Sequence, residues 1–257
     1  ILQVEGGHPL RGEITVRGAK NFVPKAMVAS LLADTPSELY NVPLIRDTDV
    51  VSDLLSLHGV QIDFDQDRGT LRMDPSNVKI ASRSDIDTLA GASRIPILFC
   101  GPLLHQLGEA FIPELGGCAI GGRPIDFHLE TLRKFGAIVD KQPDGVHIKR
   151  PATGLHGAII ELPFPSVGAT EQTLLTAVRN EGITTLKGAA IEPEILDLIN
   201  VLQKMGAIIS VDTDRTIRIE GVAKLNGYRH TALPDRIEAA SWAAAALATR
   251  GDIYVRG

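Results

Sequence analysis

The sequence predicts an α/β protein built from a repeated unit of about seventy residues. Three segments read alike: LLSLHGVQIDFDQDRGTLRM from Leu54, LRKFGAIVDKQPDGVHIKR from Leu132 and LQKMGAIISVDTDRTIRIEG from Leu202. In each, a helical apolar pattern ends at a glycine, and a short strand, an Asp-rich turn and a second alternating strand follow. The glycines, spaced 77 and 70 residues apart, are Gly59, Gly136 and Gly206. Self-similarity at this spacing indicates one supersecondary unit that is used three times.

Upstream of each glycine, the pattern predicts a strand and then a helix. The strands lie at 37–42, 108–114 and 182–188. In the third unit, apolar residues recur at helical spacing, so one face of the helix should pack on a sheet. These residues are Ile195, Leu198, Ile199, Leu202 and Met205. We therefore expect βαβαββ-type units in which amphipathic helices cover sheets.

Another helix opens each unit, and a similar short phrase introduces it. The phrases are GAKN at 18–21, GASR at 91–94, GATE at 168–171 and, less closely, DRIEAAS at 235–241. Small residues at a helix start let backbone N–H groups approach a ligand, and helix N-termini favour anions. Three of the four phrases carry a cation, namely Lys20, Arg94 and Arg236. These entrances are candidates for an anion site, and solvated surface charges are the alternative.

The fourth unit is incomplete, because its first helix at 241–251 and its first strand at 252–257 are followed by nothing more. A repeat that stops at its first strand leaves apolar surface without its partner. We expect the remainder to lie in a longer protein or in another chain. A natural end with an unusual cap is the alternative.

Composition narrows the possible functions. The chain has 257 residues, 44% of them hydrophobic, which is enough for one large core or two smaller ones. Its net charge of −5 gives no reason to expect nucleic acid, so local cations must hold any anionic substrate. No apolar run approaches membrane-spanning length, and two cysteines without a leader sequence suggest a reducing cytoplasm. The histidines form no close pair, so no metal site is expected.

The second unit is longer than the others between its first strand and its closing glycine. Units one and three count 20 residues over this stretch, and unit two counts 25. The counts start at Leu39, Leu186 and Phe111. The five extra residues fall within LGGCAIGGRP at 115–124. A departure in one repeat is where function is usually placed.

Two residues of this insertion are candidates for chemistry. Cys118 has glycine neighbours and Arg123 nearby, and such surroundings lower the pKa of a thiol and raise its reactivity, whereas a buried inert thiol is the alternative. Cys100, within PILFCGPLL, has apolar neighbours and is expected in the core. Arg123 is followed by Pro124 in a glycine loop, which favours binding of an anion, because guanidinium binds phosphate or carboxylate bidentately.

Two other phrases have two readings each. FPSVGATE at 164–171 is either a capped helix start, with Ser166 or Thr170 as the cap, or a backbone that contacts a substrate. LPDRIE at 233–238 is either functional or holds a local ion pair of Asp235 with Arg236 that contributes little. Spacing alone does not decide between these readings.

Taken together, several motifs resemble the UDP-N-acetylglucosamine enolpyruvyl transferases, which open bacterial peptidoglycan synthesis. The motifs are GAKN with Lys20 and Asn21, GGCAIGGRP, FPSVGAT, EPEI from Glu192, and LPDRIE. They occur in the family's order over essentially the whole chain. The wider enolpyruvyl transferase family, which includes the shikimate-pathway enzyme, shares the repeat architecture but is not expected to have the cysteine loop. Cys118 therefore separates the two groups.

The resemblance implies a fold of two inside-out α/β barrel domains, built from six repeats, with the active site in the cleft. The first domain would span residues 20–233. Residues 1–19 and 234–257 would be pieces of an incomplete second domain. Its missing part would carry the aspartate that acts as base and a further arginine that grips phosphoenolpyruvate. As given, the chain would be unable to turn over.

The family reaction transfers enolpyruvyl from phosphoenolpyruvate to the 3-hydroxyl of the sugar and releases phosphate. By resemblance, Cys118 is the general acid and the thiol that fosfomycin alkylates, while Lys20 and Arg123 grip phosphoenolpyruvate. Asn21 would touch the acceptor sugar, and Arg94 the nucleotide side of the site. The UDP-sugar pocket would be lined by Arg123, Pro124, Ile125, Asp126, Phe127, Phe164, Pro165, Ser166 and Val167. The implied partners are these two small molecules and the missing C-terminal region, with no cofactor, nucleic acid or membrane.

One departure from the family concerns Phe164, where some members have a lysine. This difference would remove one cation from the diphosphate site. Two alternatives stay open at this point. One is another enolpyruvyl transferase, such as the shikimate-pathway enzyme, and the other is a non-catalytic domain that keeps the UDP-sugar pocket for regulation or partner contact.

Overall fold

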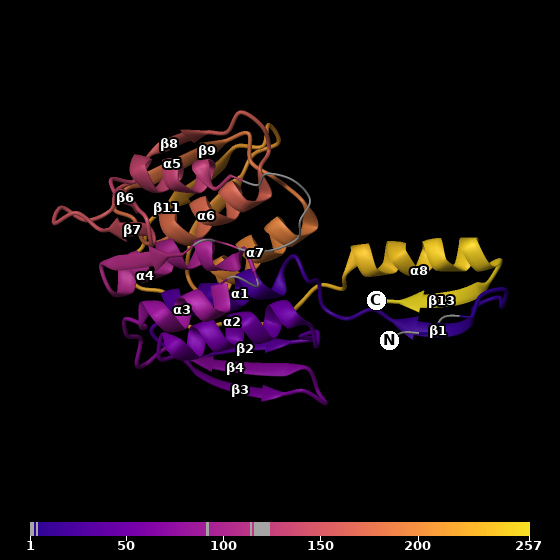
Figure 1. The fold of residues 1–257 in the computed structure, drawn as a ribbon. Helices are drawn as coiled ribbons and strands as arrows, with labels where there is room; N and C mark the ends of the chain where they lie inside the picture. The colour runs from indigo at the N-terminus through magenta and orange to yellow at the C-terminus, as the bar shows by residue number, and fades with distance from the viewer. Residues whose placement is uncertain (1–2, 4, 91–92, 114, 116–123) are drawn as a thin grey trace.

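The main body of the protein places three buried helices at its centre and three sheets around them (Figure 1). The computed structural model describes residues 3, 5–90, 93–113, 115 and 124–257. The central helices are α1 (Val23–Ala29), α4 (Cys100–Gln106) and α6 (Val167–Ala177). All of α1, most of α4 and residues 169–177 of α6 are buried. Helices inside and sheets outside are the inside-out α/β arrangement that the family resemblance implies, and the described strands form separate sheets.

Each unit contributes one sheet and one outer helix. The first sheet, in the order β12-β2-β4-β3, contains β2 (Ser37–Tyr40), β3 (Gln61–Asp65), β4 (Thr70–Asp74) and β12 (Arg229–Thr231). The second, β5-β7-β6, contains β5 (Glu109–Ile112), β6 (Ile138–Gln142) and β7 (Gly145–Lys149). The third, β10-β11-β9-β8, contains β8 (Ile159–Glu161), β9 (Ile183–Lys187), β10 (Ile208–Val211) and β11 (Ile217–Glu220). The outer helices are α2 (Arg46–Leu57), α5 (Asp126–Lys134) and α7 (Pro193–Lys204), and two short 3-10 helices are η1 (Ser30–Leu32) and η2 (Ile95–Phe99).

The three closing glycines end the outer helices in the same way, which confirms the predicted repeat. Their φ angles are +85° at Gly59, +92° at Gly136 and +107° at Gly206. This left-handed region strains residues that have a Cβ. The N–H of Gly59 donates to the Ser56 carbonyl at 2.9 Å, and the next N–H, of Val60, donates to the Leu55 carbonyl at 3.0 Å. Such a pair of bonds satisfies the last helix carbonyls and fixes where the chain leaves the helix.

The five apolar residues predicted for one face of α7 are all buried, as expected for a helix that packs on a sheet.

The burial pattern of β5 corrects the sequence alignment of the second unit, in which Phe111 was matched with Leu39 and Leu186. Strand β5 buries Ala110 and Ile112 and leaves Phe111 on its outer face. The counterpart of the inward leucines of β2 and β9 is therefore one of these two buried residues, not Phe111. The stretch to Gly136 is 26 residues from Ala110 and 24 from Ile112, so by either count the second unit remains longer than the 20 residues of the other two.

The second sheet has three strands where the other two have four. In each unit, the segment that follows the last antiparallel strand donates a backbone N–H to the C-cap carbonyl of the outer helix. These bonds run from Lys79 to His58, from His156 to Phe135 and from Asn226 to Met205. After this bond, two of the units add an edge strand in parallel, β8 beside β9 and β12 beside β2. The chain beside β5 forms α3 (Arg83–Ala90) instead. This helix replaces the fourth strand.

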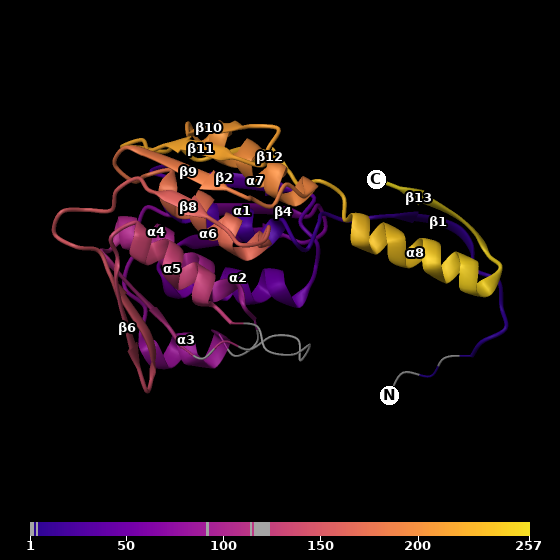
Figure 2. The same cartoon turned by 90° about the horizontal axis from the view of Figure 1, so that it is seen from above.

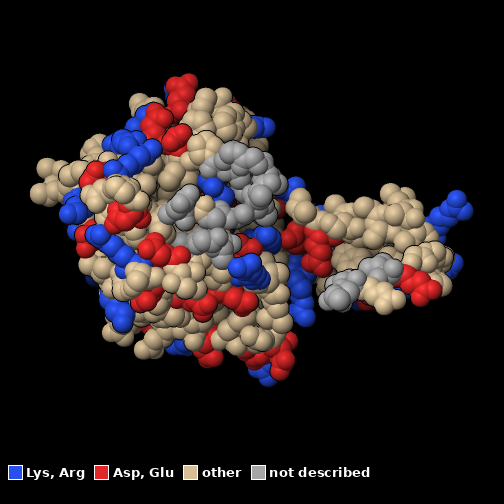
Figure 3. All heavy atoms as spheres, in the orientation of Figure 1, with Lys and Arg blue, Asp and Glu red and all other residues tan. Residues whose placement is uncertain are grey.

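A smaller part, which we call the arm, lies apart from the body in both views (Figures 1 and 2). It consists of β1 (Arg11–Thr15), α8 (Arg236–Thr249) and β13 (Asp252–Arg256), with β1 and β13 paired in parallel. Helix α8 begins five residues before the apolar run that predicted it and has no buried residue. Its Leu247 is 82% exposed. On the face shown in Figure 3, most of the arm's upper surface carries neither Lys, Arg, Asp nor Glu.

The chain crosses between body and arm twice, and the two crossings are bonded to each other. The N–H of Asp235 donates to the Arg17 carbonyl at 2.9 Å, and the N–H of Ala19 donates to the Leu233 carbonyl at 2.8 Å. Among the described helices, none has both the length and the apolarity that crossing a bilayer requires.

Candidate functional site

Residues from all four helix entrances line one pocket of about 320 Å³. Asn21 belongs to the first entrance, Arg94 to the second, Gly168 to the third and Arg236 to the fourth. The first three entrances lead into the central helices, so the common architecture of the units brings these short phrases to one end of the body. Sequence similarity had linked the phrases, and the structure places them around one space.

Lys20 connects the first entrance to its neighbours. Its ammonium lies 3.1 Å from Asp47 Oδ2 at the start of α2, and its backbone N–H donates to Asp235 Oδ2 at 2.9 Å. Asp47 also accepts a hydrogen bond from the Ser93 hydroxyl at 3.3 Å. Because the Lys20 side chain is still 55% exposed, an incoming anion can reach its ammonium beside the carboxylate.

Of the two readings of LPDRIE, the local ion pair of Asp235 with Arg236 is not the one found, because each side chain has other partners. Asp235 is the N-cap of α8, where its Oδ1 accepts from the N–H groups of Ile237 and Glu238 at 2.8 and 3.2 Å. Arg236 turns the other way and donates from Nε and Nη2 to the two carboxylate oxygens of Glu194, at 2.9 and 3.2 Å. Hydrogen bonding to Glu194 raises the pKa of Arg236. This cation therefore already has a bidentate carboxylate partner.

A buried ion pair that sequence reasoning missed lies beneath the entrances. Lys25 Nζ on α1 is 3.6 Å from Glu171 Oε1 on α6, and their side chains are only 10% and 5% exposed. The same ammonium donates to the Asn21 carbonyl at 2.9 Å. Burial raises the pKa of Glu171 to about 7, against the opposing effect of Lys25. A lysine inside the apolar run FVPKAMVASLL was the signal, since a buried lysine requires a partner.

His128 packs closely against the third entrance. A Cβ on Gly168 would lie 2.9 Å from His128 Nε2, so the glycine of GATE leaves room for this imidazole. The other ring nitrogen, Nδ1, lies 3.4 Å from Gln172 Oε1, an acceptor, which assigns the proton to Nδ1. Burial lowers the pKa of His128 to about 4, so the ring presents a neutral Nε2 near neutral pH.

Arg94 also lines a second pocket, of about 500 Å³, together with Pro124, Ile125 and Asp126. Residues 141–146, which comprise the end of β6, the turn and the start of β7, also line this pocket, and Lys141 Nζ lies 3.9 Å from Asp126 Oδ1. Arg94 therefore borders both spaces, and the segment that begins α5 is placed beside it.

The segment 164–167 lies against the start of α5. The rings of Phe127 and Phe164 meet edge to face, with their centroids 5.3 Å apart and their planes at 76°. Pro165 is exposed, and Ser166 caps α6 by accepting from the Ala169 N–H at 3.3 Å, which resolves the two candidate caps in favour of Ser166. Val167, the first residue of α6, lines the pocket of the four entrances.

Two predicted residues, Cys118 and Arg123, lie outside the described part of the chain. Cys100 is fully buried in α4, as expected from its apolar neighbours, and burial raises the pKa of its thiol. Within the described residues, no cluster of three His, Cys, Asp or Glu side chains is placed to hold a metal ion.

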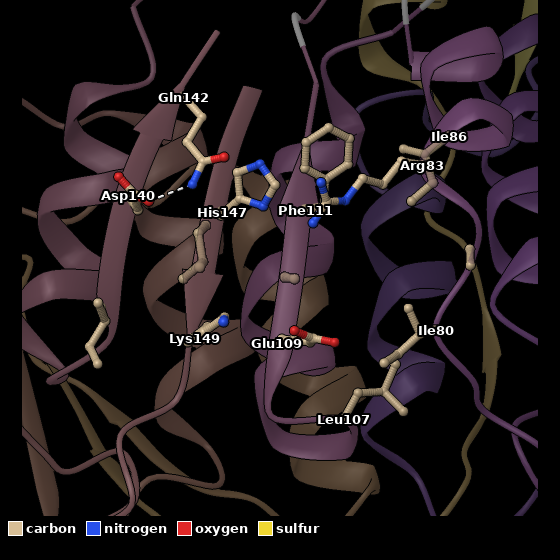
Figure 4. A pocket seen from close by; sticks show the side chains of 14 residues that line it. Ile80, Arg83, Ile86, Leu107, Glu109, Phe111, Asp140, Gln142, His147 and Lys149 are labelled. Carbon is tan, nitrogen blue, oxygen red and sulfur yellow. Dashed lines mark hydrogen bonds between the residues drawn. The ribbon is translucent and has the colours of Figure 1, made fainter. Parts of the chain in front are cut away.

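A third pocket, of about 450 Å³, lies on the outer face of the second sheet, beside α3 (Figure 4). The Arg83 guanidinium lies 5.3 Å from the centre of the Phe111 ring and pairs with Asp144 at 3.3 Å. His147 is also hydrogen-bonded to Asp144, at 2.9 Å, and this bond lowers the pKa of that carboxyl. No predicted site residue lines this pocket, so the smaller pocket at the helix entrances is the better candidate.

Comparison with known sequences shows similarity along the whole chain. A family model described as EPSP synthase (3-phosphoshikimate 1-carboxyvinyltransferase) matches residues 4–257. Two relatives named UDP-N-acetylglucosamine 1-carboxyvinyltransferase are 43% identical, from Protochlamydia amoebophila, and 45% identical, from Acidiphilium cryptum. Both matches cover 100% of this chain, but only 56% and 60% of those proteins. The chain thus spans somewhat more than half the length of these relatives.

Solved structures share the fold. The enolpyruvyl transferase NikO from Streptomyces tendae superposes with a TM-score of 0.80 at 23% identity, over 92% of this chain and 55% of that one. An EPSP synthase from Acinetobacter baumannii superposes with a TM-score of 0.71 at 19% identity, over 91% and 52%. At these identities, the likeness is evidence for the fold alone.

Proposed function

Because the chain belongs to the EPSP synthase family, we propose that it forms part of an enolpyruvyl transferase whose acceptor is UDP-N-acetylglucosamine. The reaction moves enolpyruvyl from phosphoenolpyruvate to the 3-hydroxyl of the sugar and releases phosphate. One observation carries the choice of acceptor: relatives named for this sugar nucleotide are 43% and 45% identical over 100% of the chain. The cysteine loop at 116–124 supports the same choice.

The transfer requires a proton donor, a base and fixed cations. A proton adds to C3 of phosphoenolpyruvate while the sugar oxygen, deprotonated by the base, bonds to C2. Loss of phosphate and of a proton from C3 then restores the double bond. Cations stabilise the phosphate and carboxylate throughout. We assign the proton donor to Cys118 and the anion contacts to Lys20 and Arg123, and we place the base in the part of the relatives that this chain does not span.

The sugar nucleotide is assigned to the space around the helix entrances. Asn21 would contact the sugar and Arg94 the nucleotide side, and both line the same pocket of about 320 Å³. The segments 124–127 and 164–167 would complete the wall, which the contact between Phe127 and Phe164 supports. Because Phe164 brings no cation, we expect the diphosphate to be held less tightly than in a relative with lysine at this position.

We also propose the domain division 20–233 for the first domain, with 1–19 and 234–257 as pieces of a second. The exposed α8 supports this division, since the described chain buries none of its residues and leaves Leu247 82% exposed. The missing region of the same protein would cover this helix. The proposed reaction places the protein in the cytoplasm, where both substrates are found, at the first committed step of peptidoglycan synthesis, and so connects it to cell shape and division.

Binding and labelling test this proposal with the 257-residue chain. Calorimetric titration with UDP-N-acetylglucosamine should show saturable binding, and titration with shikimate 3-phosphate should show none. Fosfomycin labelling, read by intact mass and peptide mapping, should modify Cys118 and leave the fully buried Cys100 unmodified. Binding of shikimate 3-phosphate alone would move the assignment to the shikimate-pathway reaction. Binding of the sugar nucleotide without a Cys118 adduct, in this chain and in the longer protein alike, would favour a non-catalytic binding domain.

A further inference from the structure

The centre of the body holds a charged pair that the proposed reaction leaves without a role. Lys25 and Glu171 are 8% and 4% exposed, and neither is among the residues assigned to substrate. Burial of an ammonium or a carboxylate is costly unless the charge is both paired and hydrogen-bonded. A pair of apolar residues at these positions would usually be as stable or more stable. A gain in stability therefore does not explain why this buried ion pair is present, and its contacts indicate a different role.

The contacts of Lys25 lead to the first helix entrance. Its ammonium lies between Glu171 Oε1, at 3.6 Å, and the carbonyl oxygen of Asn21, at 2.9 Å. Asn21 is outside α1, whose N-cap, Phe22, provides no side-chain cap. Lys25 thus supplies, from inside the helix, a bond that restrains the backbone of the preceding turn.

Glu171 ties this restraint to the third entrance. It lies on α6, one turn after Val167, and both residues line the same pocket as Asn21 and Arg94. The ion pair therefore joins the turn that carries Lys20 and Asn21 to the first turn of α6.

The charges around the pair fix its orientation. Glu192 and Glu194, at the start of α7, lie close enough to raise the pKa of Glu171. Glu194 is engaged by Arg236, while Glu192 Oε2 is buried without a hydrogen-bond partner among the described residues. Lys25 is the cation that lies next to Glu171, so loss of its charge would leave like charges facing one another.

We propose that Lys25 is a positioning residue, which Glu171 holds in place and which sets the backbone of the Lys20–Asn21 turn relative to α6. The effect on substrate binding rests on the proposed function, in which this turn presents Lys20 and Asn21 to the substrates. Lys25 itself acts through the Asn21 carbonyl.

The decisive variant is the double substitution Lys25→Met with Glu171→Met, because it removes both charges together and leaves no unpaired buried ion. The chain should fold as stably as the parent, as measured by urea unfolding. Its affinity for UDP-N-acetylglucosamine should fall by about tenfold, in keeping with the loss of one hydrogen bond to a charged group. Amide hydrogen exchange should accelerate at Lys20 and Phe22. Lys25→Arg, which keeps the donor, should retain most of the affinity.

A matched control is the surface pair of Lys134 with Glu130, which has the same 3.6 Å separation but exposed side chains. Lys134→Met with Glu130→Met should change neither binding nor exchange at the turn. If the parent chain binds UDP-N-acetylglucosamine and the Lys25/Glu171 double variant binds it equally well, the positioning role is overturned. If the parent chain does not bind it, the proposed function fails, and exchange at Lys20 and Phe22 alone decides: faster exchange supports the positioning role, and unchanged exchange overturns it.

Discussion

The central helix α6 and the arm helix α8 are both rich in small and apolar residues, yet they differ completely in burial. Nine residues of α6, 169–177, are buried, whereas α8 buries none. Helix α6 contacts α4, α5, α7 and two strands, while α8 packs mainly on β13. Burial in this protein therefore follows from the number of neighbours that the topology supplies to a helix, and not from the composition of the helix.

The largest test of this comparison truncates one leucine in each helix. Leu174 of α6 is fully buried, and Leu247 of α8 is 82% exposed. Leu174→Ala should lower the free energy of unfolding by about 3 kcal/mol, because it removes buried surface and leaves a cavity. Leu247→Ala should change it by less than about 0.5 kcal/mol. Urea unfolding curves measure both, and equal losses would contradict the difference in burial.

A pH series sharpens the comparison through the charge buried in α6. Burial raises the pKa of Glu171 to about 7, with Lys25 opposing and Glu192 and Glu194 reinforcing the shift. Between its ordinary value and pH 7, the native state binds more protons than the unfolded chain, so the free energy of unfolding falls as pH rises. This fall is on the order of 3 kcal/mol at most, and Glu171→Gln should abolish it.

The control for the pH series comes from the arm. Glu13 lies in an exposed ion pair with Arg256. Glu13→Gln should leave the slope of unfolding free energy against pH, measured in urea from pH 5 to 8, as it is in the parent. Parallel slopes for the parent and the Glu171→Gln chain would mean that Glu171 titrates as a solvated carboxyl.

The smallest effect expected concerns two serines. Ser166 caps α6 through the Ala169 N–H, and Ser241 lies inside α8, where its hydroxyl donates to the Ile237 carbonyl at 2.9 Å. Ser166→Ala should lower the free energy of unfolding by about 1 kcal/mol, because it leaves a helix N–H without a partner. Ser241→Ala should stay within about 0.5 kcal/mol. Thermal unfolding, monitored by circular dichroism, measures both variants. A larger loss of unfolding free energy in Ser241→Ala than in Ser166→Ala would contradict the expected ranking.

Much of the body could be predicted from the sequence because its signals are local. The closing glycines, the alternating strands and the apolar face of α7 each depend on neighbours within a few residues. The exchange of a strand for α3 could not be predicted, since the chain makes the same C-cap bond at Lys79 as in the other units before it diverges.

Side-chain partners at the site depended on contacts between distant segments. Lys25 pairs with Glu171, which lies on another unit. Arg236 binds Glu194 and not its neighbour Asp235, because Asp235 caps the start of α8 while the Arg236 side chain points toward α7. The positions of the entrances in the sequence were therefore informative, while the charge state and partner of each entrance required the fold.

The pairing of β1 with β13 also has a consequence for how the molecule assembles. Arg11 faces Asp252, so this small sheet closes a loop that contains the whole body. Contacts between such distant segments are slow to form, because the closure entropy must be overcome before the contact is gained. Folding of the body first draws the two crossings together and shortens the effective loop. The arm is thus expected to form last, at a rate that the body determines.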